Sequence, residues 1–398
     1  MGCGNWHAEY LRIHRNILKG NRPNRQLVVV GLKSGFNDNL TGKLMGLYLS
    51  LLTRRALRFI TYGTIPQFTS ALQSPFLDLF ADAKDFPPEV VSPLTDLHNG
   101  SSCYGADRTF NWTFETNKTY SPLYLVNSDA QRFFLSGDLS KYKPDVEYLM
   151  YASNRAAIYH LVEDSSEGNK ANRQRLQQLG VTNCSNAFLC AFFFLFKPNQ
   201  EVIKQFHKTW NKLSNSSALK IGIHVRVGDA EFAAPHDIVK GRVQIEKFLA
   251  YFRCAQEIEN SRKKENQTVI WYVISDSLSI RLAAQERFGS KVLIDKLRAS
   301  HLDCNHVATS CKEHAQNVSM QLAVGEMLAF SLADVHVYGK DSGYGRSGAW
   351  LSVRPQAEGP GRKHLYDLFN HERYRNRSCG ISDYADPSDD SRQWSGIR

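Results

Sequence analysis

The sequence Ile-Gly-Ile-His-Val-Arg-Val-Gly-Asp spans residues 221–229 and joins an apolar run of strand length to three polar residues. Side chains alternate across a strand, so His224 and Arg226 are expected on the same face. Ligands of open α/β folds bind at the carboxyl ends of strands, and a guanidinium fixed there can hold a phosphate through two hydrogen bonds. The stretch therefore predicts a parallel strand that opens into an anion-binding site. The alternative is a structural ion pair between Arg226 and Asp229.

Strand and helix patterns alternate on the carboxyl side of this stretch. Short apolar runs predict strands at residues 220–225, 268–274, 291–294 and 335–338. Helical spacing of apolar residues predicts helices at residues 243–258, 281–288 and 314–333, and one that ends near Trp350. Such alternation is typical of a parallel sheet. We expect a Rossmann-like domain over residues 215–354 and a polar tail over residues 355–398.

The amino-terminal half contains a second pattern of the same kind. Residues 26–31 are apolar, residues 34–39 read Ser-Gly-Phe-Asn-Asp-Asn, leucines then recur at helical spacing, and residues 56–62 predict another strand. Strand, loop, helix and strand make one βαβ unit, which places the 34–39 loop at a strand end. We expect a Rossmann-like domain over residues 25–210, preceded by a segment of residues 1–24. The predicted fold class is thus α/β, with two Rossmann-like domains that face each other across a cleft.

The region between residues 63 and 210 is less regular. It is interrupted by Pro, Gly and cysteine residues, and we expect long loops here that determine acceptor specificity. Its longest apolar run, residues 187–196, is too short to span a bilayer, and we interpret it as a buried strand. Residues 211–217 are polar and predict a linker between the two domains.

A glycine-rich turn follows the last predicted strand. Ser342, Gly343, Tyr344, Gly345 and Arg346 lie between a strand and a helix, where backbone N–H groups and a helix N-terminus can face an anion. We assign these five residues to a phosphate cradle, with a plain tight turn as the alternative. Residues 343–348 also match the dinucleotide fingerprint G-x-G-x-x-G. Only 398 − 348 = 50 residues follow it, which makes a complete dinucleotide-binding unit hard to fit.

Two further strand ends carry polar residues. Ser275 and Asp276 follow the strand at 268–274, where Asp276 can accept hydrogen bonds from a base or ribose or can cap the next helix. In the first loop, Gly35 suits an unusual turn, and Asp38 or Asn39 can orient a sugar. We assign four positions of this loop to donor binding, namely Gly35, Phe36, Asn37 and Asn39. Simple loop chemistry is the alternative.

The overall charge favours acidic partners. The chain has 398 residues, 42% of them hydrophobic, and a net charge of 49 − 39 = +10. That balance is typical of proteins that bind nucleotides, anionic glycans, nucleic acid or membrane surfaces, although scattered charge gives the same number. No RNA-recognition or zinc-finger signature is present, so nucleic acid is not an expected partner. Residues 1–20 show no signal peptide or anchor, and we expect membrane attachment only through an anchor outside this chain.

Sequons and cysteines indicate the secretory pathway. The glycosylation pattern Asn-x-Ser/Thr starts at nine positions: Asn39, Asn99, Asn111, Asn117, Asn183, Asn215, Asn266, Asn317 and Asn376. A glycan on Asn39 would block the predicted site loop. The eight cysteines include the close pairs 184/190 and 304/311, which fit disulfides in an oxidising lumen.

Metal ligation is not favoured by the sequence. Cys304, His306, Cys311 and His314 superficially offer zinc ligands, but a Cys304–Cys311 disulfide is the simpler interpretation. No D-x-D element of the kind that holds a nucleotide-sugar metal is present. Arginine and a helix N-terminus would then supply the positive charge.

Four elements in order resemble the fucosyltransferase superfamily that includes alpha-1,2-, alpha-1,6- and protein O-fucosyltransferases, with some likeness to plant xyloglucan fucosyltransferases. They are the loop and helix at 34–53, I-G-I-H-V-R-V-G-D at 221–229, Y-V-I-S-D-S at 272–277, and S-L-A-D-V-H-V with S-G-Y-G-R within 331–346. The resemblance implies a GT-B-like fold and a metal-independent, inverting enzyme that uses GDP-fucose. We expect the protein in the secretory pathway, in the Golgi lumen. The resemblance also implies that Arg226 contacts the GDP phosphates and that His224 is a donor-site residue. Asp276 and Ser342 match positions near guanine, ribose or phosphate.

The chain departs from the family pattern at two places. Many members have two consecutive arginines, whereas Val227 follows Arg226 here, and the first loop is closer to that of bacterial chitooligosaccharide relatives. These departures leave the linkage open. A secretory glycan-binding pseudoenzyme is therefore one alternative function, and an NAD-dependent oxidoreductase built on residues 343–348 is another.

We expect transfer of fucose from GDP-fucose to a hydroxyl of a glycan or glycoprotein. Arg226 would stabilise the departing diphosphate, and a carboxylate would take the proton of the acceptor hydroxyl. The candidates for that carboxylate are Asp229 and Glu231, which are nearest in sequence, and Asp38 from the other domain.

Overall fold

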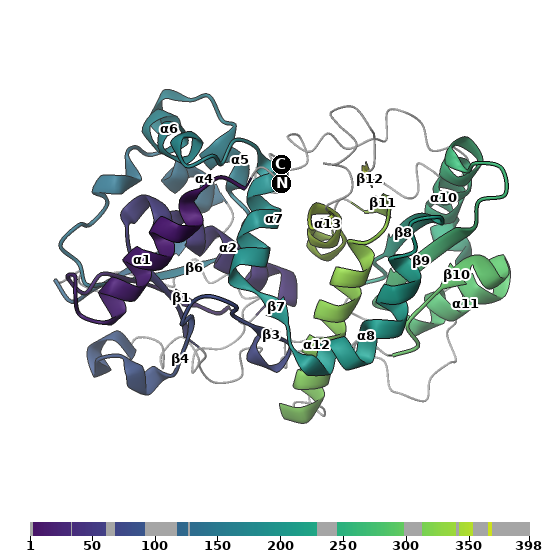
Figure 1. Ribbon diagram of the computed structural model, residues 1–398, viewed down its shortest axis with the longest axis horizontal. Helices are drawn as coiled ribbons and strands as arrows, with labels where there is room; N and C mark the ends of the chain where they lie inside the picture. The colour runs from purple at the N-terminus through teal and green to yellow at the C-terminus, as the bar shows by residue number, and fades with distance from the viewer. Residues whose placement is uncertain are drawn as a thin grey trace. The chain divides into compact units, whose positions relative to one another are not determined.

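The computed structural model describes residues 3–32, 34–60, 68–91, 118–125, 128–228, 245–297, 313–339, 342–352 and 365–367. They divide into two compact units, the first comprising the described residues up to Lys197 and the second those from Pro198 onward. Both units are α/β and contain a five-stranded sheet (Figure 1). No helix within the described ranges is long and apolar enough to cross a membrane.

The first unit is built around a sheet in the order β4-β2-β1-β6-β5, and all neighbouring strands are parallel. Its strands are β1 (Gln26–Val30), β2 (Ala56–Ile60), β4 (Phe80–Ala81), β5 (Tyr120–Leu125) and β6 (Tyr148–Ser153). Its helices are α1 (Trp6–Leu18), α2 (Phe36–Thr53), α4 (Ser128–Phe134), α5 (Ile158–Val162), α6 (Lys170–Gln178) and α7 (Cys184–Leu195). Short elements complete it: η1 (Phe68–Ser70), β3 (Leu72–Gln73), η2 (Ala83–Asp85), η3 (Leu139–Lys141) and η4 (Glu167–Asn169), with β7 (Lys197–Pro198) at the boundary.

The second unit has a sheet in the order β10-β9-β8-β11-β12, again parallel throughout. Its strands are β8 (Leu219–Val225), β9 (Val269–Ser275), β10 (Val292–Leu293), β11 (Val335–Tyr338) and β12 (Leu365–Asp367). Its helices are α8 (Gln200–Leu213), α10 (Leu249–Arg262), α11 (Leu278–Phe288), α12 (Glu313–Phe330) and α13 (Gly343–Trp350), with the single turns η5 (Ile245–Phe248) and η6 (Gly289–Lys291).

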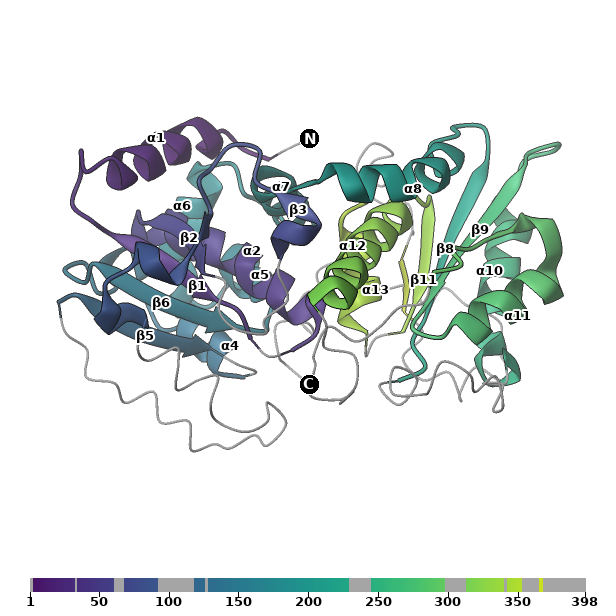
Figure 2. The same ribbon diagram turned by 90° about the horizontal axis from the view of Figure 1, so that it is seen from below.

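Strand β8 is buried on both faces, as expected of a central parallel strand. Ile221, Ile223 and Val225 pack in one hydrophobic cluster with α10 and α11. Gly222 and His224 point the opposite way, where a Cβ atom at Gly222 would lie 2.8 Å from the Phe330 ring of α12. Figures 1 and 2 accordingly show α10 and α11 on one side of this sheet and α12 and α13 on the other.

Each sheet has one point where the order of its strands reverses. In the second unit the chain runs outward from β8 through β9 and β10, then returns to place β11 on the other side of β8. In the first unit the chain runs outward from β1 through β2 to β4, then crosses to β5 at the opposite edge and returns to place β6 beside β1. Ligands of open α/β sheets bind outside the carboxyl ends of the strands at such reversal points. The topology therefore selects the β8/β11 edge of one sheet and the β1/β6 edge of the other.

The expectation of a strand at residues 187–196 is wrong, because this run belongs to helix α7. Periodicity does not separate a buried helix from a buried strand when nearly every residue is apolar. The residue before the helix is the signal that was available: the side chain of Asn183 accepts a hydrogen bond from Asn186 N at 2.8 Å, which caps the helix N-terminus.

The region in which we expect long loops between elements contains regular elements as well. Its described part, from residue 68 to residue 210, contains β5, β6 and the helices α4 to α8. The first residues of the predicted linker at 211–217 belong to α8, which ends at Leu213. The Phe206 ring would lie 2.1 Å from a Cβ atom at Gly325 of α12, and Trp210 Nε1 donates to Gly325 O at 3.2 Å. Because α8 packs on α12, the division falls before α8 and not near residue 210.

The segment before residue 25 is an integral part of the first unit. Tyr10 of α1 is buried, its hydroxyl donates to Arg55 O at 3.3 Å, and Leu57 N donates to that hydroxyl at 3.1 Å. Cys3 forms a disulfide with Cys190 of α7. The close spacing of Cys184 and Cys190 therefore did not identify the partner of Cys190.

Candidate functional site

The carboxyl end of β8 carries His224 and Arg226, as the sequence predicts. His224 is buried, whereas the Arg226 side chain is 37% exposed. Arg226 Nη1 lies 3.1 Å from Asp276 Oδ2, so its partner comes from the neighbouring strand end. Asp229, which was the expected alternative partner, lies outside the described residues, as does Glu231.

Asp276 holds the loop that follows β8. Its two carboxylate oxygens accept hydrogen bonds from Val227 N at 2.8 Å and from Gly228 N at 2.9 Å. The helix that follows, α11, has Ser277 and not Asp276 at its N-cap position. The carboxylate is thus engaged with the backbone and with Arg226, which fixes the guanidinium where β8 ends. Helix capping therefore does not describe Asp276, and hydrogen bonding to a base or ribose stays a prediction.

His224 lies directly against the start of α13. A Cβ atom at Gly345 would be 2.6 Å from His224 Nδ1, so only glycine allows this approach. Burial, with smaller contributions from the charges of Arg226 and Arg281, lowers the pKa of His224 to about 3. Within the described part of the chain, His224 Nδ1 has no hydrogen-bond partner. The imidazole is therefore neutral at physiological pH and contributes no cation to the site.

The first turn of α13 lies beside β8 because β11, which precedes it, pairs with β8. Ser342 is the N-cap residue, and its side chain makes no capping hydrogen bond. The first N–H groups of a helix lack partners within the helix and carry partial positive charge. Ser342 is buried and Gly343 is partly exposed at this turn. The geometry therefore suits a phosphate at the β8/β11 reversal point.

Residues of α13 contact helix α12. The Tyr344 hydroxyl donates to Ala323 O at 2.6 Å, which ties α13 to α12, and Arg346 is buried. Gly348, the last glycine of the fingerprint, allows α13 to approach Phe330, whose ring would lie 2.8 Å from a Cβ atom there. Packing thus explains two of the three fingerprint glycines, Gly345 and Gly348.

A strand follows Gly348 and completes a βαβ unit with β11 and α13, and the expectation that a full dinucleotide-binding unit is hard to fit after Gly348 stays a prediction. Strand β12 follows α13 and pairs with β11 in parallel, from His336↔Leu365 to Tyr338↔Asp367. A three-residue strand at the sheet edge suffices for this, and so short a run leaves little periodicity to detect. The turn at 342–346 therefore has the strand–turn–helix–strand context of a nucleotide-binding unit.

A buried ion pair beneath the site was not foreseen. Arg281 of α11 and Glu326 of α12 are almost fully buried and are paired, with Arg281 Nη2 3.1 Å from Glu326 Oε2. Arg281 Nε also donates to Ser275 O at 2.8 Å, which holds the last residue of β9. Burial raises the pKa of Glu326 to about 7, with the arginine opposing this shift and the nearby Asp295 adding to it. The pair therefore supports the residue immediately before Asp276.

Three donor-site assignments in the first loop are not supported by the local geometry. Asn39 is 3% exposed, and its side-chain amide hydrogen-bonds to the backbone of the loop. Leu32 N donates to Asn39 Oδ1 at 2.8 Å, and Asn39 Nδ2 donates to Leu32 O at 3.0 Å and to Ser34 O at 3.2 Å. Gly35 has φ −60°, so no unusual turn requires glycine there. Phe36 is buried and stacks on Phe68, with ring centroids 5.4 Å apart.

Asp38 lies in the first turn of α2, at the β1/β6 reversal point of its own sheet. Helix α2 packs closely on the end of β6, because a Cβ atom at Gly42 would be 2.2 Å from Ser153 O. Burial raises the pKa of Asp38 from 3.8 to about 6, and the charge of Arg155, which follows β6, opposes that shift. Asn37 is partly exposed beside it. A carboxylate with such a pKa can accept a proton near neutral pH.

The assigned residues therefore fall into two groups. The structure brings together one group at the β8/β11 edge of the second sheet: His224, Arg226, Ser275, Asp276 and the turn at 342–346. The loop at 34–39 lies at the corresponding edge of the first sheet. The cysteines and histidines considered for zinc, from Cys304 to His314, lie outside the residues whose side chains are described. Among those that are described, no group of three or more His, Cys, Asp or Glu is placed to hold a metal.

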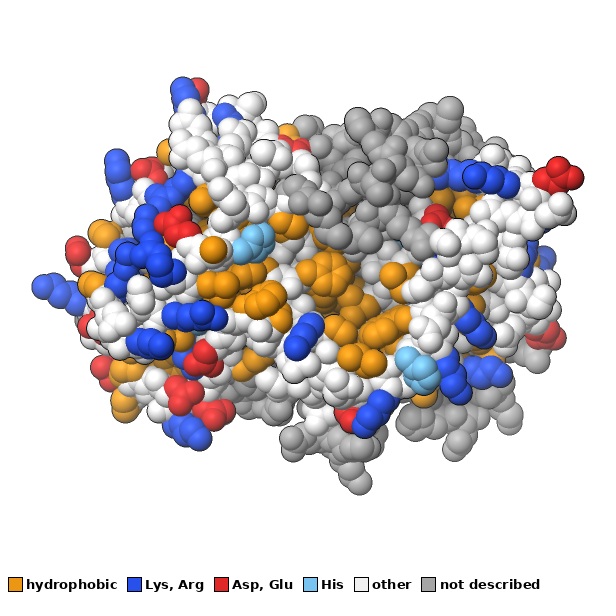
Figure 3. All heavy atoms as spheres, in the orientation of Figure 1, with side chains coloured by type: hydrophobic (Ala, Val, Ile, Leu, Met, Phe, Trp, Pro, Cys, Tyr) orange, Lys and Arg blue, Asp and Glu red, His pale blue; other side chains and the backbone are white. Residues whose placement is uncertain are grey.

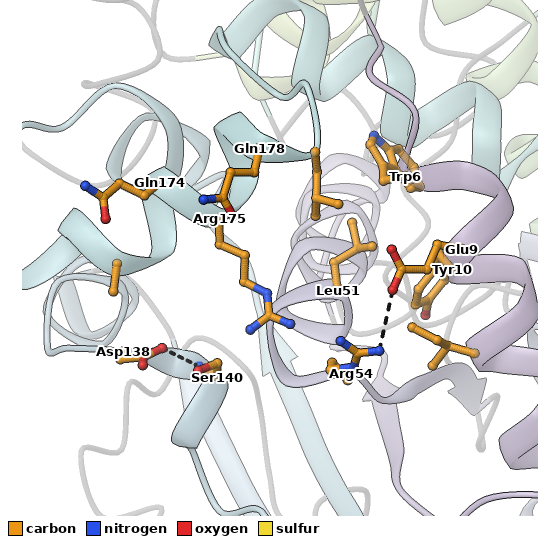
Figure 4. Close-up of a pocket in the computed structure, with 13 residues that line it drawn as sticks. Trp6, Glu9, Tyr10, Leu51, Arg54, Asp138, Ser140, Gln174, Arg175 and Gln178 are labelled. Atoms are coloured by element: carbon orange, nitrogen blue, oxygen red, sulfur yellow. Dashed lines mark hydrogen bonds and ion pairs between the residues drawn. The ribbon is translucent and has the colours of Figure 1, made fainter.

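A groove of about 420 Å³ lies elsewhere in the first unit (Figure 4). It is lined by α1, the carboxyl-terminal end of α2, η3 and α6, and Arg54 pairs with Glu9 at 3.5 Å inside it. Leu51 and Arg54 are at the opposite end of α2 from Asp38, so this groove is separate from the loop at 34–39.

On the face shown in Figure 3, lysine and arginine side chains are interspersed with acidic ones.

Comparison of the whole chain with known proteins identifies its fold. No protein-family model and no curated protein sequence matches the chain. Its structure is similar to that of a mutant of Arabidopsis thaliana FUT1 in complex with GDP, with a TM-score of 0.59, 17% sequence identity, and coverage of 95% of this chain and 81% of that one. It is less similar to the fucosyltransferase NodZ from Bradyrhizobium (TM-score 0.48, 10% identity, 87% and 96% coverage) and to a family 9 glycosyl transferase from Veillonella parvula (0.38, 14%, 93% and 95%). The chain thus has a fucosyltransferase-like GT-B fold.

Proposed function

We propose that this chain is an inverting glycosyltransferase that moves fucose from GDP-fucose to a hydroxyl of a glycan or glycoprotein, without a metal ion. The observation that carries the proposal is the ion pair of Arg226 with Asp276, which fixes a partly exposed guanidinium where β8 ends. That strand end adjoins the first turn of α13 at a reversal point of a GT-B fold. The Arabidopsis FUT1 structure, which has this fold, is a complex with GDP.

The second unit would bind the donor through its diphosphate. Arg226 and the N–H groups that begin α13 supply the positive charge that a departing GDP requires, so a metal ion is not needed for this purpose. Asp276 positions Arg226 through their ion pair. His224, being neutral, fills the space between β8 and Gly345 without repelling Arg226.

The first unit would supply the general base. Asp38 is mostly ionised above pH 6, and its carboxylate would take the proton of the acceptor hydroxyl. The acceptor oxygen forms a bond to the anomeric carbon of fucose as the bond from that carbon to GDP breaks, through an oxocarbenium-like state. A single displacement of this kind inverts the anomeric centre. Asp229 and Glu231 remain the alternative bases.

The proposed location is the lumen of the Golgi. The Cys3–Cys190 disulfide and the nine sequons support an oxidising, glycosylating compartment. The partners would be a nucleotide sugar and a glycan acceptor.

A nucleotide panel tests the donor. Purified protein would be melted with GDP, UDP, CMP or NAD, and we expect GDP to raise the melting temperature most. Stabilisation by NAD alone would favour the oxidoreductase, and stabilisation by GDP without fucosyl transfer to any glycan would favour the pseudoenzyme.

Transfer kinetics test the role of Arg226. Arg226→Ala should lower turnover at least ~100-fold, as loss of one charge-stabilising donor commonly does. Arg287→Ala is the matched control, because Arg287 also forms an ion pair in this unit, with Glu246 at 3.2 Å, but is more exposed. Activity that persists in a metal chelator is expected, and near wild-type turnover by Arg226→Ala would overturn the mechanism.

A further inference from the structure

Two exposed sequons lie together at the amino-terminal ends of β8 and β9, whereas the proposed donor site is at the carboxyl ends of the strands. We propose that Asn215 and Asn266 carry N-linked glycans in the secretory lumen and that Asn39 does not. This inference rests on the lumenal location proposed above and is independent of fucosyl transfer. The sequons at Asn183 and Asn317 are partly buried and are not included, and those at Asn99, Asn111, Asn117 and Asn376 lie outside the described residues.

Asn215 is presented on the turn between α8 and β8. The residue is exposed, and its Oδ1 accepts hydrogen bonds from Ser217 N at 3.0 Å and Ser217 Oγ at 2.8 Å. The amide oxygen is thereby held within the sequon itself. In the described part of the chain, no acceptor engages the amide nitrogen, which is the atom that a glycan would occupy.

Asn266 is presented on the equivalent turn between α10 and β9. It is exposed and has φ 58°, a left-handed conformation that asparagine adopts more readily than most residues. Thr268, the third residue of its sequon, is exposed as well. A bulky substituent on this turn would extend into solvent and displace no packed side chain.

The two turns lie side by side where β8 and β9 begin, at the amino-terminal ends of the strands, which we call the amino edge of the sheet. Gln267 Nε2 donates to Ser217 O at 3.1 Å, and Leu219 and Val269 are paired where β8 and β9 begin. Arg226 follows the far end of β8, which at about 3.3 Å per residue is roughly 20 Å away. Glycans on this edge would therefore leave the β8/β11 site open.

Asn39 serves as the comparison within the same chain. It has the same sequon motif as Asn215 and Asn266 but is buried, whereas they are exposed. Its amide nitrogen is bonded to backbone oxygens of the first loop, and the residue is 3% exposed. A glycan would replace one of the two hydrogens of that nitrogen, so these bonds could not all persist, and the buried side chain leaves no space for it beside α2. Modification at this position is incompatible with the folded chain.

The modification would follow ordinary N-glycosylation chemistry. The asparagine amide nitrogen attacks the anomeric carbon of an oligosaccharide carried on a lipid pyrophosphate. A carbon–nitrogen bond forms, the nitrogen loses one proton, and the carbon–oxygen bond to the pyrophosphate breaks, so the lipid pyrophosphate leaves with the electron pair.

Peptide mass spectrometry tests the proposal. The full chain, directed to the lumen of cultured cells by a cleavable signal peptide, would be deglycosylated by an amidase in heavy-oxygen water, which converts each glycosylated asparagine to labelled aspartate. We expect label at positions 215 and 266 and none at position 39. Label at position 39, or an unlabelled 215 or 266, would overturn the proposal.

Sequon variants and GDP binding separate this proposal from the catalytic one. Ser217→Ala should remove only the glycan at Asn215, and Thr268→Ala only that at Asn266. Both variants should keep the thermal shift given by GDP. Loss of that shift would show that the amino edge is not separate from the donor site and would overturn the placement of the glycans, whereas failure of fucosyl transfer alone would leave it intact.

Discussion

Gly345 lies so close to His224 that a Cβ atom there would be 2.6 Å from Nδ1 and 2.8 Å from Cγ of the imidazole. His224 is buried and has no room to withdraw. In an ordinary helix position, Gly→Ala is favourable by about 1 kcal/mol, so any destabilisation by Gly345→Ala reports the steric overlap. We expect a loss of about 1–3 kcal/mol in the free energy of unfolding, together with weaker GDP binding.

Urea denaturation and GDP titration would measure both effects of Gly345→Ala. The control is Gly35→Ser, because Gly35 has φ −60° and a Cβ atom there would have no neighbouring atom within 4 Å. Its stability should be nearly unchanged, since serine is at least as good an N-cap residue as glycine. Equal stabilities of the two variants would contradict the close packing of α13 on β8.

The Asp276 carboxylate connects Arg226 to the backbone of the following loop, so Asp276→Asn should disturb both. The amide nitrogen that replaces one oxygen cannot accept from Val227 N or Gly228 N, and the ion pair to Arg226 is lost. Loss of such bonds typically removes about 1–3 kcal/mol. We expect the Kd for GDP, measured by calorimetry, to rise at least ~10-fold.

Asp334→Asn provides the comparison for Asp276→Asn. Asp334 also accepts a backbone hydrogen bond, from Lys220 N at 2.8 Å, and pairs with the Lys220 ammonium at 3.4 Å, but at the amino end of β8. A folded Asp334→Asn protein should bind GDP as the wild type does. If both variants weaken GDP binding equally, the effect is one of general stability and not of the site.

The Arg281–Glu326 pair should be strongly coupled in stability. Removing one partner of a buried ion pair typically costs about 3–5 kcal/mol, whereas replacing both by apolar residues costs far less. We therefore expect Arg281→Met to destabilise the chain severely and the double variant Arg281→Met/Glu326→Met to recover much of that loss. A double-mutant cycle by urea denaturation measures the coupling, and additive effects would contradict it.

Much of the fold was predictable because its signals are local. Strand β11 has the predicted bounds of Val335–Tyr338, and α2 follows the expected leucine spacing. The strand end with His224 and Arg226 was identified for the same reason, since an apolar run followed by polar residues needs no knowledge of distant contacts.

What the sequence did not reveal depends on residues that are far apart in the chain. Arg281 and Glu326 are separated by 45 positions and Cys3 and Cys190 by 187, so no local pattern links either pair. Asp276 was recognised as a site residue, but its partners Val227 and Gly228 lie on another strand end. Pairing between elements is decided by the topology, which the sequence pattern restricts only to a class.

Asp38 has a raised pKa and is the proposed general base. The ionised form that catalysis requires is therefore the form that destabilises the folded chain. The folded pKa of Asp38, about 6, is above its usual 3.8, so the folded state holds the proton more tightly. The stabilisation from this group is complete below pH 3.8 and is lost as the pH rises through 6. At pH 7 the buried charge is unfavourable, and Asp38→Asn should raise the melting temperature.

The same substitution should slow transfer strongly, because an amide cannot accept the proton of the acceptor hydroxyl. We expect kcat/KM of the wild type to rise with pH and level off above about 6, and turnover of Asp38→Asn to fall at least ~100-fold with an unchanged Kd for GDP. Asp138→Asn is the control carboxylate, since hydrogen bonding to Ser140 lowers the pKa of Asp138 and it lies beside the groove at the other end of α2. A variant that is more stable, binds GDP normally and does not transfer fucose would identify Asp38 as the base. Transfer at the wild-type rate would leave Asp229 and Glu231 as the candidates.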